Sequence, residues 1–177
     1  MKLFKKLAAA ALAAVLALSM VGCGNANSVN STKQFILNFL ADSTVMSTGE
    51  YHNTSEMDGI AQKLLTEANA AYQDETQTDK TVKALMQAAA EKEGILKEGT
   101  GYEISFVEDY QFKSSLIPEV QKQLMLMQMM DSIRVNGGVN EGATKLDVGV
   151  AVDKIGDKTY AVVVMTSAET AAAPDRD

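Results

Sequence analysis

The chain of 177 residues contains one cysteine and one histidine, so few of its side chains can do chemistry. Cys23 carries a thiol that a lipid group can modify, and it directly follows a small residue, Gly22. His52 lies in a polar stretch, where an imidazole can act as a general base or as a single metal ligand. An intrachain disulfide and a typical zinc site both need more thiols or imidazoles, so the sequence predicts neither.

The residues before Cys23 have the three parts of a secretory signal. A basic start with three Lys precedes an apolar run over residues 7–21, and a small residue ends the pattern. The motif MVGC over residues 20–23 resembles the lipobox of bacterial lipoproteins, with Met where Leu is more usual. The resemblance implies that residues 1–22 are removed and that Cys23 carries acyl chains such as palmitate. It also implies attachment to the extracytoplasmic face of the cell membrane.

Residues 7–21 have a second interpretation as a membrane-spanning helix. About 15 apolar residues are fewer than the roughly 20 that cross a bilayer, and the following Gly-Cys-Gly is not a stop-transfer flank. Two or three acyl chains hold a protein durably on a membrane, because each buried CH2 contributes about 0.8 kcal/mol. The sequence therefore favours lipid attachment, which leaves no free thiol for catalysis.

Composition divides the chain into four segments. These are a signal peptide (1–22), a lipidated Cys with a flexible tether (23–32), a single globular domain (33–166) and a disordered tail (167–177). The signal peptide carries three Lys and no acid, so its removal leaves 155 residues and changes the net charge from −7 to −10. Such an acidic surface excludes nucleic acid as a partner and makes the lipid the membrane contact.

Three helices are predicted in the first half of the domain, over residues 31–47, 55–72 and 82–94. Ser31 and Ser55 are the expected N-caps, because Gln34 and Asp58 follow each of them by three positions. Residues 49–54 are expected to form a loop.

The second half begins with an alternating apolar pattern over residues 102–107, which predicts a strand. An apolar helix is expected at 115–133. The last part predicts a hairpin of residues 145–153 and 159–165, with a turn around Gly156.

The predicted elements favour an α+β fold, because helices come first and the strands are few. The hairpin strands are apolar on both sides, so we expect helices on both faces of a sheet. Gly149 and Ala151 give one face a shallow surface that a helix can approach closely. The predicted architecture is an α/β/α sandwich with a small, mainly antiparallel, three-stranded sheet that ends in a hairpin.

The hairpin sequence TKLDVGVAVDKIGDKTYAVVVM, residues 144–165, is similar to the closing hairpin of the CAP superfamily of cysteine-rich secretory, antigen 5 and pathogenesis-related proteins. The sequence GYEI at 101–104 matches the place of a Gly-Glu-Asn-Ile strand in that family, with Glu103 as the acid. The family's cavity uses two His and two Glu, but residues 131–136, before the hairpin, contain no His. The resemblance therefore implies an α/β/α scaffold that has lost its metal chemistry.

His52 and Glu103 are the two candidate site residues. An ordinary loop histidine ahead of a helix cap also explains His52, because no second His or nucleophile motif accompanies it. An enzyme would need both side chains within hydrogen-bond reach in a concave pocket. The sequence contains no zinc-protease, serine-hydrolase, phosphate-loop or calcium-loop motif, so it predicts no cofactor and no metal site.

Residues 124–130, LMLMQMM, allow two interpretations. Met-rich surfaces adapt to varied apolar partners, and Met sulfur binds copper. The predicted helix is apolar nearly all round, which favours a buried core helix. Exposure of two or more of these Met side chains would favour a groove for a partner instead.

Two functions remain from the sequence. The first is a membrane-anchored extracytoplasmic lipoprotein with a non-catalytic, degenerate CAP-like domain that binds a protein or small molecule or associates with the envelope. The second is an extracytoplasmic enzyme or metal-dependent activity in a cleft, with His52 and Glu103 as its starting residues.

Overall fold

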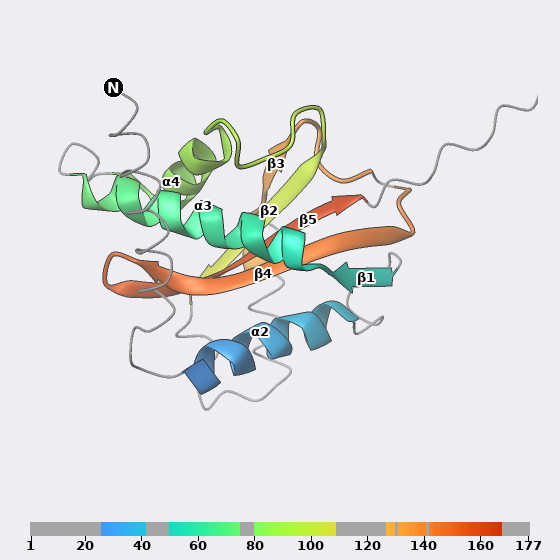
Figure 1. Ribbon diagram of the computed structural model, residues 1–177, viewed down its shortest axis with the longest axis horizontal. Coiled ribbons are helices and arrows are strands. Elements are labelled where there is room, and N and C mark those ends of the chain that lie inside the picture. The colour runs from blue at the N-terminus through green and yellow to red at the C-terminus, as the bar shows by residue number, and fades with distance from the viewer. Residues whose placement is uncertain are drawn as a thin grey trace, which may run out of the picture.

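The computed structural model describes residues 26–41, 50–74, 80–108, 127–129, 131–140 and 142–167. Its helices are α2 (Ala26–Ala41), α3 (Ser55–Gln73) and α4 (Val82–Ala90). Its strands are β1 (Glu50–Asn53), β2 (Tyr102–Glu108), β3 (Ile133–Val135), β4 (Lys145–Ile155) and β5 (Lys158–Ser167). They form one sheet in the order β1-β4-β5-β2-β3, in which β1 is parallel to β4 and the other neighbouring pairs are antiparallel (Figure 1).

The combination of helices with one sheet agrees with the predicted α+β class, but the three-stranded, mainly antiparallel sheet is wrong. The sheet has five strands and is mixed. The two additional strands are short: β1 has four residues in the expected loop, and β3 has three residues where the sequence predicts the end of a helix. So few residues cannot show an alternating pattern. These strands form because they pair with strands that are distant in the sequence.

The predicted hairpin is confirmed by β4 and β5. Their pairing extends along β4 from Leu146 to Ile155, and residues 156–157 form the turn. Gly156 has a φ of 65°, a conformation that glycine adopts without a steric penalty. Its N–H donates a hydrogen bond of 3.0 Å to Oδ1 of Asn69, so the turn docks on α3.

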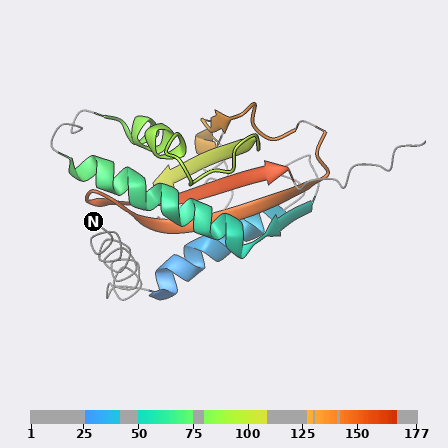
Figure 2. The same ribbon diagram turned by 45° about the horizontal axis from the view of Figure 1, so that its top comes forward.

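Helices cover both faces of the sheet (Figure 1, Figure 2). On one face, α3 and α4 pack against β2, β4 and β5, and the large side chains that they bury are Met57, Ile60, Leu64, Leu65, Leu85 and Met86. On the other face, α2 buries Ile36, Phe39 and Leu40. The same strands thus contribute to two cores, which explains why β4 and β5 are apolar on both sides.

Gly149 allows α3 to approach β4 closely. A Cβ atom at this position would lie 2.0 Å from the carbonyl carbon and oxygen of Met57 and 2.5 Å from the backbone nitrogen of Asp58. A side chain therefore does not fit between the strand and the first turn of α3. The predicted close approach of a helix at Gly149 is confirmed.

The N-terminal ends of two helices differ from the prediction. Helix α2 begins at Ala26, so it includes most of the segment assigned to the tether and starts before the expected cap, Ser31. The N-cap of α3 is Thr54 rather than Ser55, because the Thr54 backbone is extended and its Oγ1 accepts a hydrogen bond of 3.2 Å from Met57 N. The first helix therefore begins earlier than predicted, and the N-cap of α3 lies one residue before the predicted one.

Several predictions concern residues outside the described part of the chain. They are the signal peptide, Cys23, most of the helix predicted at 115–133 and the tail after Ser167. Residues 127–129 of that helix are described and form one helical turn. Among the helices described, none combines the length and the hydropathy that a membrane-spanning segment requires.

Candidate functional site

His52 lies on the edge strand β1 with its side chain 80% exposed. Its Nδ1 is 3.6 Å from Oδ1 of Asp147, the residue opposite it on β4. An exposed ring beside one carboxylate lacks the enclosure that catalytic acid–base groups use. This position fits an ordinary surface histidine ahead of the α3 cap.

Glu103 lies half-buried on β2. Its Oε1 accepts a hydrogen bond of 2.6 Å from Oγ of Ser132, so the carboxylate ties the residue before β3 to β2. Met165 is opposite Glu103 on β5 and belongs to the core beneath α2. Because cross-strand partners point to the same face, Glu103 lies on the α2 side of the sheet.

The structure does not bring His52 and Glu103 together. Strands β4 and β5 lie between their strands, and three strand spacings put the two backbones about 14 Å apart. His52 is opposite Asp147, which shares the α3 face of β4 with Gly149, so the two candidates also lie on opposite faces. The hydrogen-bonded pair that the enzyme hypothesis requires is absent at these two positions.

The described residues contain no group of three or more His, Cys, Asp or Glu side chains that could hold a metal ion. In the Met-rich stretch, Met127 is 69% exposed, whereas Met129 is buried in the core beneath α2. The other Met residues of this stretch lie outside the described residues. The criterion of two exposed Met side chains is therefore not reached among the positions described.

A shallow groove of about 540 Å³ lies between α3 and the turn after α4. Its lining includes Glu56, Gly59 and Lys63 of α3, residues 94–97 of the turn and Tyr102 of β2. A Cβ atom at Gly59 would have no neighbour within 4 Å. Glycine inside a helix costs about 0.5–1 kcal/mol relative to alanine, and no packing contact requires it here. This groove was not predicted from the sequence. Gly59, a glycine within a helical pattern, is the local signal that could have indicated it.

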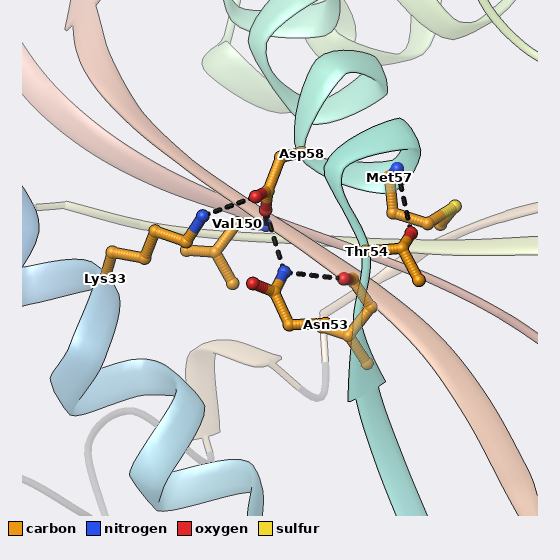
Figure 3. A network of polar contacts seen from close by, with 7 residues as sticks. Lys33, Asn53, Thr54, Met57, Asp58 and Val150 are labelled. Atoms are coloured by element: carbon orange, nitrogen blue, oxygen red, sulfur yellow. Dashed lines mark hydrogen bonds and ion pairs between the residues drawn. The ribbon is translucent and has the colours of Figure 1, made fainter.

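A polar cluster around Asp58 joins α2, β1, α3 and β4 (Figure 3). Oδ1 of Asp58 accepts hydrogen bonds from Val150 N and from Asn53 Nδ2, both at 2.9 Å. Its Oδ2 is 2.5 Å from Nζ of Lys33 on α2. The Asn53 amide nitrogen also donates to the carbonyl oxygen of Val148 at 2.9 Å. One carboxylate and one amide thus connect both layers of helices to the sheet.

The position of Asp58 follows from the end of β1. Because β1 stops at Asn53, no further residue of this strand accepts the N–H of Val150, and the Asp58 carboxylate supplies the missing acceptor. The sequence analysis treated Asp58 only as a capping partner of Ser55. Its partners Lys33 and Val150 are 25 and 92 positions away, so local spacing does not reveal them.

Burial raises the pKa of Asp58, but hydrogen bonds from Lys33, the Val150 N–H and Asn53, together with the Lys33 charge, outweigh burial and hold the pKa below its ordinary value. The carboxylate is therefore ionised at neutral pH, with donors on both oxygens. A general base needs an oxygen that faces a substrate. The cluster thus acts as a structural clamp.

The described residues present one open groove and one structural clamp, and they separate the two side chains that the sequence proposes for catalysis. Comparisons of the chain with protein-family models, curated proteins and solved structures found no match.

Proposed function

We propose that the chain is a membrane-anchored extracytoplasmic lipoprotein whose domain is a non-catalytic binding or envelope-associated module. The anchor rests on the basic start, the apolar run and the motif MVGC that ends in Cys23. The net charge of −10 after removal of residues 1–22 supports a lipid as the attachment, because an acidic surface is repelled by anionic membranes.

One observation supports the non-catalytic part of this proposal. His52 and Glu103 lie on opposite faces of the sheet, about 14 Å apart across two intervening strands. Proton transfer between two side chains requires heavy atoms within roughly 3 Å, directly or through one water. The enzyme hypothesis therefore loses the pair of residues on which it was based.

A degenerate CAP-like scaffold is part of the proposal. It is supported by the β4–β5 hairpin, which includes most of residues 144–165, and by the helices that precede it. His52 alone cannot supply the two imidazoles of the family's cavity. Such a scaffold retains a binding role without metal chemistry.

The groove beside α3 is the concave surface that we assign to binding. Apolar Ile95 and Leu96 lie on one side, and charged Glu56 and Lys63 lie on the helix. The groove is open, and its lining offers a ligand both apolar and charged contacts. Gly59 leaves space between these charged residues, so a ligand can approach the helix backbone.

Replacement of Cys23 by Ser tests the anchor. We expect the parent chain in the membrane fraction and its mature N-terminal peptide to carry the mass of an acylated cysteine. The Cys23→Ser chain lacks the thiol that accepts lipid, so we expect it to be released or to remain as an unprocessed precursor. Asn25→Ser, two positions on, is the matched control and should behave like the parent. A mature parent chain with a free thiol at Cys23 would refute the proposal.

A further inference from the structure

Helix α2 begins close to the proposed lipid anchor. Cys23 precedes Ala26, the first residue of α2, by three positions, and three residues span at most about 11 Å in an extended chain. The first turn of α2 is thus held within about one helix diameter of the bilayer surface. This argument rests on the proposed function, because it requires that Cys23 carry the lipid.

Helix α2 has almost no charge in an acidic protein. Its one charged residue is Lys33, whose ammonium group is paired with Asp58. Among the α2 residues whose side chains the structure describes, Val29, Gln34, Asn38 and Ala41 are exposed, and the last three lie on the face opposite the buried Ile36 and Leu40. Anionic headgroups repel acidic surfaces, so an uncharged helix beside the anchor is the surface that can approach the membrane without an electrostatic penalty.

The opposite layer carries many exposed charges of both signs. They include Glu56, Lys63, Glu91, Lys92, Glu93, Lys97 and Glu98. Figure 2 shows α2 on one side of the sheet and α3 and α4 on the other. These charged side chains keep their hydration when this layer, which also contains the groove, faces away from the bilayer.

We infer that the outer face of α2, formed by Gln34, Asn38 and Ala41, lies against the lipid headgroups of the membrane that holds Cys23. The sheet then stands between the bilayer and the groove, and the groove opens away from the membrane. The α2 face is thus a lipid contact that fixes the orientation of the domain.

Two matched variants, Gln34→Cys and Gln87→Cys, test this orientation. Both glutamines are exposed on helices, α2 and α4 respectively, and each donates a hydrogen bond to the residue four positions later. Cys23 is the only native cysteine, so after acylation the introduced thiol is the single site for a fluorescent label. The labelled, full lipidated protein is placed in phosphatidylethanolamine and phosphatidylglycerol vesicles that contain a lipid with a nitroxide headgroup.

We expect several-fold stronger quenching of the label at position 34 than of the label at position 87, because two packed layers of about 10 Å each separate the helices. Equal quenching, or stronger quenching at position 87, in protein that sediments with the vesicles would overturn the orientation and leave the anchor intact. If the parent chain accepts label at Cys23, or does not sediment with the vesicles, the lipid anchor itself is refuted. The two failures are therefore distinguishable.

Discussion

Asp58 shows how one side chain can replace a missing segment of backbone. Its carboxylate accepts the N–H of Val150 after β1 has ended, and it also neutralises Lys33. The side chain is 26% exposed, so water satisfies these donors only in part if the carboxylate is removed. The stability of the domain is expected to depend on this residue more than on the acids at the surface.

We predict that Asp58→Ala lowers the free energy of unfolding by about 2 kcal/mol, because it leaves the Val150 N–H without its acceptor and Lys33 without its counterion. Urea denaturation at neutral pH measures the change. The matched control is Glu56→Ala, an exposed acid in the same turn, for which the expected change is within about 0.5 kcal/mol.

The same pair of proteins gives a pH test. Because the folded-state pKa of Asp58 is lowered, its contribution is complete above the unfolded-state pKa of about 3.9 and is lost as pH falls through the folded-state pKa. The difference in unfolding free energy between the parent and Asp58→Ala should therefore shrink below about pH 4. An unchanged difference across this range would contradict the role assigned to the carboxylate.

At the scale of an element, the N-cap of α3 is Thr54 in the structure, whereas the sequence predicts Ser55. Thr54→Ala should lower the free energy of unfolding by about 1 kcal/mol, because Thr54 Oγ1 caps the helix through Met57 N. Ser55→Ala, at the cap that the sequence predicts, should have an effect near zero. Equal losses in thermal or urea unfolding would show that the cap is shared.

Two glycines on α3 and β4 should respond in opposite directions to alanine. Gly149→Ala is expected to be strongly destabilising, because its Cβ overlaps the backbone of Met57. Gly59→Ala meets no atom within 4 Å and should stabilise the helix by about 0.5–1 kcal/mol. Unfolding midpoints of the two variants against the parent measure both effects. A loss of stability in Gly59→Ala would mean that the groove does not have the open space described.

The elements that the sequence predicts well are long. Helix α3 and the β4–β5 hairpin each carry an apolar pattern over many residues, so their class and most of their bounds follow from periodicity. Strand β1 has no such pattern, and its residue Asn53 contacts Val148, which is 95 positions away. Its strand form depends on a partner that local sequence does not identify.

The candidate site shows the same limit. His52 and Glu103 were chosen as candidates by residue type. Whether they can act together depends on strand order, and β4 and β5 lie between their strands. Asp58 was recognised as a helix-start residue, yet its contacts with Lys33 and Val150 arise only when α2 and β4 meet. Spacing along the chain predicts which side chains share an element, and it does not predict which elements become neighbours.

For the whole molecule, α2 is a structural layer that covers one face of the sheet. We predict that Leu40→Ala lowers the free energy of unfolding by about 2–5 kcal/mol, because Leu40 is buried in the core beneath the sheet. Gln34→Ala, at an exposed position on the opposite face of the same helix, should change it by less than about 0.5 kcal/mol. Comparable small effects in urea denaturation would show that the domain does not need α2.

Strand order also has a consequence for when the domain can assemble. Strands β4 and β5 come after the other described elements in the chain, and α2, β1 and α3 all pack on them. A chain that emerges from the ribosome N-terminus first therefore lacks the strands on which α2, β1 and α3 pack until about residue 167 has appeared. For the exported lipoprotein that we propose, such late, long-range assembly would leave the chain unfolded during its transfer across the membrane.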